Sequence, residues 1–116
     1  MDIVSFEVAK FLYCTYRYKK DTAYMYDLFG RLHLSLEPEQ AYLIPAPTVQ
    51  EAVDFLWSVG IKIYYAPKKG KCLSLVMMGE DVSELRDLCN TPSESYVNSL
   101  QYLTKLHMLW KELKDI

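Results

Sequence analysis

The chain has 116 residues, and its 13 Lys and Arg residues stand against 15 Asp and Glu residues, which gives a formal net charge of −2. Apolar residues make up 51% and charged residues 24%, proportions that are typical of globular domains and exclude a disordered chain. The length predicts a single domain over residues 1–116. No stretch approaches the roughly 20 apolar residues of a membrane helix, so we expect no membrane partner.

The N-terminus and the cysteines predict the cellular compartment of the protein. Asp2, Glu7 and Lys10 interrupt the apolar run that an export signal needs. The three cysteines are widely spaced and form no Cys-x-x-Cys pair: Cys14, Cys72 and Cys89. These features predict a cytoplasmic protein with reduced, mostly buried thiols. A catalytic or redox cysteine is the alternative.

The first predicted element is a helix that begins near Ser5. The Ser5 hydroxyl is a suitable N-cap, and Glu7 is favourable near the positive end of the helix dipole. Apolar residues then repeat at helical spacing until the pattern fades at residues 14–16.

A hairpin is expected next. Residues 22–28 are rich in aromatics and predict a strand, and Gly30 supplies a tight turn. Residues 31–36 alternate, which leaves His33 on the polar face and predicts a buried face made of three leucines: Leu32, Leu34 and Leu36. Residues 41–44 predict a short edge segment that ends before the following prolines.

The second predicted helix has the clearest start signal in the chain. Thr48 and Glu51 form a capping box, in which each side chain accepts a hydrogen bond from the backbone N–H of the other residue. Gly60 is suited to end the helix in the left-handed conformation.

A second hairpin is predicted from residues 61–66 and 72–78, with a turn at residues 67–70. The apolar second strand is expected either to be buried on both faces or to lie at the centre of the sheet. Residues 81–89 predict one or two helical turns, with apolar residues at a spacing of three.

The last predicted helix begins at Thr91, with Pro92 in the first helical position and Glu94 completing a second capping box. It extends over ~22 residues, or ~33 Å, so one end is expected to project from a domain of this size. The element order is α-β-β-α-β-β-α. This order predicts an α+β fold, in which three helices pack on a small antiparallel sheet made of two hairpins.

Two stretches carry a resemblance to known sequences: SFEVAKFL at residues 5–12 and APTVQEAVDFLW at residues 46–57, with a tyrosine-rich strand and its glycine turn between them. The chain resembles a set of small uncharacterised proteins encoded by intestinal anaerobic bacteria and by their phages and mobile elements. It departs from them at residues 28–30, where those proteins more often carry a polar Asn-Gly or Asp-Gly turn. It also carries an extra segment at residues 81–90. The resemblance implies a mobile-element origin and a small α+β fold, and it implies no catalytic residue.

The sequence contains no motif that is typical of an enzyme. His33 and His107 lie far apart and have no second His or Cys close by, so no metal site is expected. The four glycines are isolated and form no phosphate-binding loop. Cys89 precedes a helix N-terminus, a position that lowers a thiol pKa in some enzymes, but a loop residue is the simpler interpretation. We therefore predict no catalytic residue, no cofactor and no metal.

Ten tyrosines and an aromatic content of 14% predict an interaction surface, because a Tyr ring has an apolar body and a polar tip. The leading hypothesis is a non-enzymatic module that binds a protein partner or forms a homodimer. Its candidate residues are Tyr16, Tyr18, Tyr24, Tyr26, Tyr64 and Trp110.

A nucleic-acid-binding accessory protein is the alternative. Basic residues lie next to aromatic ones in two segments, and such a surface can stack single-stranded bases. The net charge of −2 argues against this function. The candidate contacts are Arg17, Lys19, Lys20, Lys62, Lys68, Lys69 and Lys71.

Overall fold

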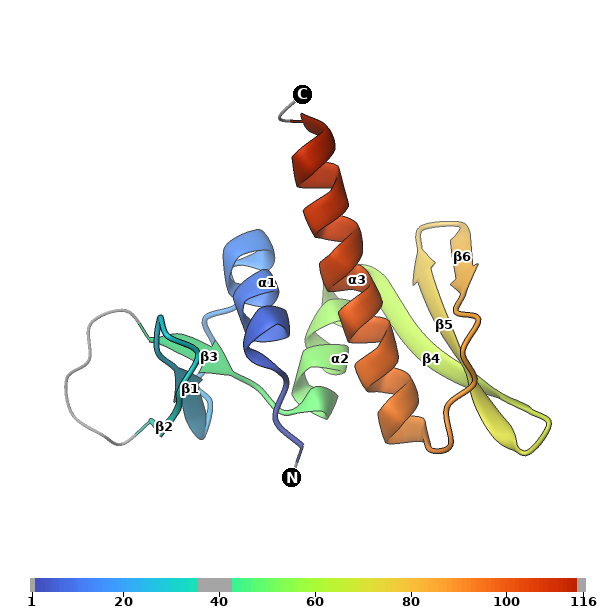
Figure 1. Cartoon of the computed structure of the whole chain (residues 1–116), viewed down its shortest axis with the longest axis horizontal. Helices are drawn as coiled ribbons and strands as arrows, with labels where there is room; N and C mark the ends of the chain where they lie inside the picture. Colours follow the sequence, from blue (N-terminus) through green and yellow to red (C-terminus); the bar gives the residue numbers. More distant parts are fainter. Residues whose placement is uncertain (1, 36–42, 115–116) are drawn as a thin grey trace. The chain divides into compact units, whose positions relative to one another are not determined.

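A computed structural model describes residues 2–35 and 43–114 of the chain (Figure 1). The α+β class and the predicted order of helices and hairpins are confirmed. Each hairpin has a third strand, so the strands form two antiparallel sheets instead of one. The elements are α1 (Phe6–Tyr16), β1 (Tyr24–Tyr26), β2 (Leu32–Leu34), β3 (Ile44–Ala46), α2 (Val49–Ser58), β4 (Ile61–Lys68), β5 (Lys71–Met78), β6 (Asp81–Glu84) and α3 (Pro92–Lys114).

The chain divides into two compact units, residues 1–52 and residues 53–116. The first unit contains α1 and the sheet β2-β1-β3, and the second contains α3 and the sheet β4-β5-β6. Helix α2 begins in the first unit and ends in the second. The expectation of a single domain stays a prediction.

Helix α1 has the predicted start. The Ser5 hydroxyl accepts a hydrogen bond from the N–H of Val8 over 3.4 Å, which satisfies one of the free donors of the first turn. The helix ends where Arg17 adopts the left-handed conformation, with φ of 54°. Its buried face is formed by Val8, Ala9, Phe11 and Leu12.

The first sheet differs from the prediction in two respects. Strand β3 includes Pro45, which was expected to end the segment. The order β2-β1-β3 makes β3 an edge strand, and an edge strand tolerates a residue that has no N–H. The predicted strand end at Leu36 and half of the segment at residues 41–44 lie outside the described residues.

The leucines of β2 are exposed, so their predicted burial is wrong. Leu32 and Leu34 share a face with Tyr26 and Tyr24, their partners on β1. Helix α1 packs against β3, at the opposite edge of the three-stranded sheet. Strand β2 therefore lies beyond the helix that covers the sheet, and both leucines face solvent.

Helix α2 begins with the predicted capping box. The N–H of Thr48 donates to Glu51 Oε1 over 2.9 Å, and the N–H of Glu51 donates to Thr48 Oγ1 over 3.1 Å. Beyond the helix, Gly60 has a φ of 93°, a conformation that favours glycine. The chain then enters β4 at Ile61.

Residues 81–84 form strand β6, so the predicted helical turns are wrong. Met78 and Asp81 are partners in the ladder, and the positive φ of Gly79 closes the turn between them. Apolar residues that recur at every third position fit a helix. Here, however, a tight turn directly after β5 returns the chain along that strand. The ladder then satisfies the backbone groups of this segment.

The second hairpin turns more tightly than predicted. Strand β4 continues through Lys68, and only Lys69 and Gly70 form the turn, with φ of 52° and 74°. Two central residues with positive φ match the type I′ turn that is favoured in hairpins. Pro67 was expected in the turn and lies in the strand instead.

Hydrogen bonding explains why Pro67 is tolerated there. The N–H of Leu85 donates to the carbonyl of Ser74, and Cys72 and Cys89 exchange two backbone hydrogen bonds. Even-numbered residues of β5 therefore direct their backbone groups toward β6 and the segment after it. Odd-numbered residues of β5 therefore face β4, where their ladder partners are even-numbered. Odd-numbered residues of β4 direct their backbone groups away from β5, and the missing N–H of Pro67 interrupts no bond.

Helix α3 packs against β4 and β5 (Figure 1). Half of its predicted capping box is present, because the N–H of Glu94 donates to Thr91 Oγ1 over 3.2 Å. The Glu94 carboxylate accepts from the N–H of Asn90 over 3.1 Å instead of from that of Thr91. It covers the face of the sheet that carries Tyr65 and Ser74, which are ladder partners. Ser74 bonds to Ser95, and the rings of Tyr65 and Tyr96 pack edge to face. Leu100 and Leu103 of α3 are buried, as are Ser74 and Ser95.

Candidate interaction surface

The turn between β1 and β2 presents two large apolar side chains to solvent. Phe29 is 87% exposed and Leu28 is 61% exposed. With the exposed Leu32 and Leu34 of β2 they form the hairpin patch, which consists of Leu28, Phe29, Leu32 and Leu34. Exposed apolar groups that gather on one element are typical of an interaction site.

The carboxylate of Asp27 fixes this turn. Its Oδ1 accepts hydrogen bonds from the N–H groups of Phe29 and Arg31 over 2.8 and 3.0 Å. Its Oδ2 lies 2.8 Å from His33 Nε2. The hydrogen bond with His33 is the largest effect that holds the pKa of Asp27 below its ordinary value of 3.8, and the N–H groups add to it.

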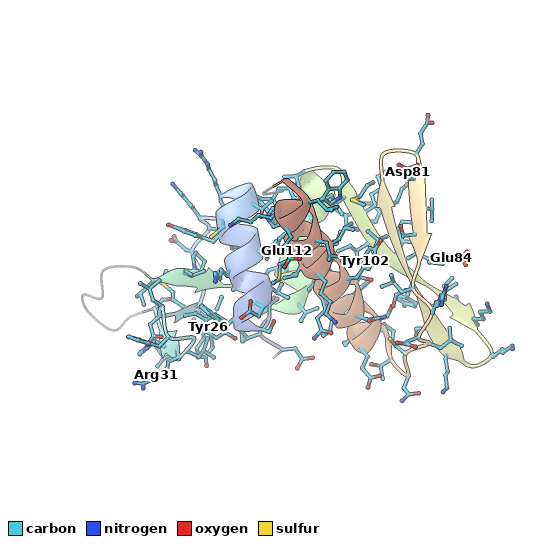
Figure 2. The ribbon with its side chains drawn as sticks, turned by 45° about the horizontal axis from the view of Figure 1, so that its top comes forward. Tyr26, Arg31, Asp81, Glu84, Tyr102 and Glu112 are labelled. Carbon is cyan, nitrogen blue, oxygen red and sulfur yellow. The ribbon has the colours of Figure 1, made fainter. Side chains whose placement is uncertain are left out.

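The same turn rests on α1. Gly30 has a φ of 81°, and a Cβ built on it would lie 3.2 Å from Cδ2 of Phe6. The Phe6 ring packs edge to face on Tyr26, whose hydroxyl donates to the carbonyl of Val4 over 2.6 Å. Figure 2 shows Tyr26 beside the start of α1 and Arg31 further out along the hairpin. The hairpin is therefore anchored on α1 while Phe29 stays exposed.

The candidate tyrosines of the first unit are mainly structural. Tyr18 is only 2% exposed, so its predicted place on an interaction surface is wrong. The left-handed turn at Arg17 redirects the chain, and Tyr18 becomes part of the core. Tyr16 packs edge to face on Phe11. Burial raises the pKa values of three of these phenols, Tyr16, Tyr18 and Tyr26, and Tyr24 is half-buried in β1.

In the second unit, Tyr64 packs around Trp57. The two ring centroids lie 6.1 Å apart, and the Tyr64 hydroxyl donates to Met77 Sδ over 3.8 Å. Lys62 Nζ lies 5.7 Å from the Trp57 ring centroid, within the range of a cation–π contact. Tyr64 and Lys62 are therefore held by local contacts.

Trp110 is 59% exposed near the end of α3. The last turns of this helix carry three further exposed apolar side chains, Met108, Leu109 and Leu113. Apolar residues earlier in α3, such as Leu100 and Leu103, contribute to the core, and those of its last turns do not. Trp110 is therefore accessible, and its place on an interaction surface stays a prediction.

The candidate basic residues fall into two groups on different units. Arg17, Lys19 and Lys20 are exposed after α1. At the other hairpin, Lys68 and Lys71 are directly opposed ladder partners, and Lys69 forms the turn between them. Within residues 2–35 and 43–114, no carboxylate lies at ion-pair distance from these three lysines. Opposed like charges are unfavourable in a ladder.

A hydroxyl cluster lies between the second sheet and α3. Ser74 Oγ lies 2.7 Å from Ser95 Oγ and receives a hydrogen bond from Asn98 Nδ2 over 3.4 Å. Ser99 Oγ is buried and has no hydrogen-bond partner in the described part of the chain. Cys89 Sγ lies 3.9 Å from Ser74 Oγ. The three serines are fully buried, whereas Cys89 is half-buried.

A polar cleft of about 340 Å³ lies between α3 and residues 84–87. Figure 2 labels two of its lining residues, Tyr102 on α3 and Glu84 on β6. Its lining includes cationic, anionic and amide side chains, so no single ligand charge is favoured. The other lining residues are Leu85, Arg86, Asp87, Asn98, Gln101 and Lys105.

Among the described residues, no group of three His, Cys, Asp or Glu side chains is placed to hold a metal ion. No described helix is long and apolar enough to cross a membrane. The chain matches no family model, no curated protein and no solved structure. The resemblance to mobile-element proteins therefore stays a prediction.

Proposed function

We propose that the chain is a non-enzymatic protein-binding module and that the hairpin patch is its contact surface. The observation that carries this proposal is the 87% exposure of Phe29 in a turn whose backbone is fixed by Asp27. Exposing a phenylalanine to water forgoes roughly 1.5–3 kcal/mol of burial energy. A partner with an apolar pocket recovers that energy on binding.

The rigidity of the turn supports the same proposal. Asp27 also accepts, through its carbonyl, a hydrogen bond from the N–H of Gly30 over 3.1 Å, and its own N–H donates to the carbonyl of Arg31 over 2.9 Å. A side chain on a fixed backbone loses less conformational entropy on binding than one on a mobile loop. Central aromatic anchors of this kind dominate the binding energy of many interfaces.

The proposal is tested by photo-crosslinking in the native host. A photoreactive phenylalanine analogue is placed at position 29 and, as a control, at position 109 on α3, where Leu109 is also exposed. We expect one protein to be crosslinked from position 29 and not from position 109. Its affinity is then measured for the wild type and for Phe29→Ser and Leu109→Ser.

Phe29→Ser should weaken this complex at least about tenfold, and Leu109→Ser should leave it unchanged. Equal affinity of Phe29→Ser and the wild type would contradict the proposal. Sedimentation of the same proteins shows whether the partner is a second copy. A homodimer through the apolar end of α3 would instead be weakened by Leu109→Ser.

A second candidate function, nucleic-acid binding, is favoured by one specific observation: the lysines at the β4–β5 turn. Lys68, Lys69 and Lys71 gather there although their mutual repulsion is unfavourable. A phosphate backbone would neutralise that repulsion, and binding would weaken steeply with salt. Anisotropy of labelled single-stranded DNA and RNA tests this function, with Lys68→Gln/Lys71→Gln compared with Lys105→Gln/Lys111→Gln on α3. Identical binding by the two variants would exclude the turn as a contact.

A further inference from the structure

Cys72 and Cys89 are direct partners across an antiparallel bridge. The N–H of Cys72 donates to the carbonyl of Cys89 over 2.7 Å, and the N–H of Cys89 donates to the carbonyl of Cys72 over 2.9 Å. Such a hydrogen-bonded pair has a Cα separation of about 5.5 Å. Disulfides span Cα separations of roughly 4.4–6.8 Å, so the backbone already stands at disulfide distance.

The two side chains lie on the same face of the sheet. Directly opposed residues of a ladder share a face, and the position of Cys89 Sγ agrees with this. It lies 3.9 Å from the hydroxyl of Ser74, which is two residues along β5 from Cys72 and therefore on the same face as Cys72.

The two thiols differ in accessibility. Cys72 is buried, and Cys89 is half-buried at the end of the connection that precedes α3. An attacking reagent therefore reaches Cys89 first, and Cys72 is placed to react in a second step. An exposed first thiol with a partner beside it is the arrangement of reversible redox sites.

We propose that Cys72 and Cys89 form a reversible thiol–disulfide site that exchanges with small disulfides such as oxidised glutathione. The Cys89 thiolate attacks the small disulfide, forms a mixed disulfide and releases one small thiol. The Cys72 thiolate then attacks the Cys89 sulfur and releases the second small thiol. Two protein thiols are oxidised and one small disulfide is reduced to two thiols, so electrons and protons balance.

Ladder geometry explains why this bond is expected to be reversible. Opposed residues have Cβ atoms about 4.5–5.5 Å apart, whereas a disulfide needs roughly 3.5–4.5 Å. The strands must approach slightly, and the strain makes the bond easier to reduce. The site is therefore expected to respond to the ratio of small disulfide to small thiol rather than to stay oxidised.

The test uses the full chain with Cys14→Ser, which removes the exposed third thiol. The folded protein is equilibrated with mixtures of oxidised and reduced glutathione, and then thiol exchange is quenched with acid. Mass spectrometry should show the loss of two hydrogens. Tryptic cleavage after Lys71, Arg86 and Lys105 should yield one linked pair of peptides that contain Cys72 and Cys89.

Reduced glutathione should reverse the mass change completely. The variants Cys72→Ala and Cys72→Ser provide two ways to remove the second thiol, and each should accumulate a glutathione adduct on Cys89. A stable adduct on Cys89 in the protein that retains Cys72 would overturn the proposal. A disulfide between two chains, or two unmodified cysteines in the folded protein when the urea-unfolded protein reacts, would overturn it as well.

Discussion

The indole Nε1 of Trp57 donates a hydrogen bond to the backbone carbonyl of Ile63 over 2.9 Å. Ile63 is an odd-numbered residue of β4, and its backbone groups therefore point away from β5. The tryptophan occupies an acceptor that an additional strand would otherwise use. Four positions along the same edge, Pro67 has no N–H to offer. Two residues of different chemistry thus reduce the pairing capacity of one strand edge.

Removing the indole N–H should destabilise the second unit. Trp57→Phe retains an aromatic ring but loses the hydrogen bond to Ile63, and a typical net loss is about 1 kcal/mol. Trp110→Phe is the matched control, because Trp110 is exposed and makes no such bond among the described residues. Urea denaturation followed by circular dichroism measures both variants. Equal losses would show that the bond to Ile63 contributes nothing.

The hydroxyl cluster beneath α3 predicts opposite effects for two serines of one helix. Ser99→Ala removes a buried hydroxyl that has no hydrogen-bond partner among the described residues, so the free energy of unfolding should stay constant or rise. Ser95→Ala removes the group that lies 2.7 Å from Ser74 Oγ and should cost about 1 kcal/mol. Thermal denaturation of both variants gives the comparison. A larger loss for Ser99→Ala than for Ser95→Ala would contradict the assigned hydrogen bonds.

Acid should loosen the turn that carries Phe29. The pKa of Asp27 is lowered in the folded chain. The contribution of its carboxylate to stability is therefore fully present above the unfolded pKa and is lost as the pH falls through the folded pKa. The amide resonances of Phe29 and Arg31 should shift together when the pH falls from about 6 to about 2. Asp27→Asn retains an acceptor oxygen for both N–H groups but removes the titrating charge.

In the Asp27→Asn variant these two resonances should no longer shift together with pH. The amide of Lys10, on α1, provides the reference for general acid effects. A wild-type titration in which Phe29 and Arg31 do not respond would show that the carboxylate does not organise the turn.

The capping box of α2 predicts a specific pair of variants. Thr48→Ala removes the acceptor of the Glu51 N–H and should lower the free energy of unfolding by about 1 kcal/mol. Glu51→Gln retains an oxygen that accepts from the Thr48 N–H, so its effect should be smaller. Chemical denaturation measures both. A Glu51→Gln loss that exceeds the Thr48→Ala loss would indicate that charge, rather than the cap, dominates this helix start.

The helix starts could be predicted because capping is local chemistry. Ser5, Thr48 and Thr91 each act on N–H groups within three residues of themselves, and no distant contact is needed to recognise them. Strand β6 was missed because its identity depends on the turn at Gly79, which returns the chain along β5. The α+β class follows from the element order, whereas the division into two sheets does not.

The candidate site was predicted less well. Burial of Tyr18 and exposure of Leu32 and Leu34 depend on where α1 covers the sheet, which no local pattern reveals. A signal for the hairpin patch was nevertheless present. Leu28 and Phe29 precede Gly30 in a turn where polar residues are usual. Two large apolar residues in such a turn favour a binding role over a structural one.

The blocked edge of β4 also bears on how the protein behaves at high concentration. Growth of a cross-β fibril needs a strand whose free N–H and carbonyl groups form a continuous template for the next chain. Along β4 the template is interrupted at Ile63, whose carbonyl accepts from the Trp57 indole, and at Pro67, whose backbone nitrogen carries no hydrogen. An apolar hairpin of eight-residue strands is an aggregation hazard in isolation. In the folded chain these two interruptions oppose its recruitment into a growing fibril.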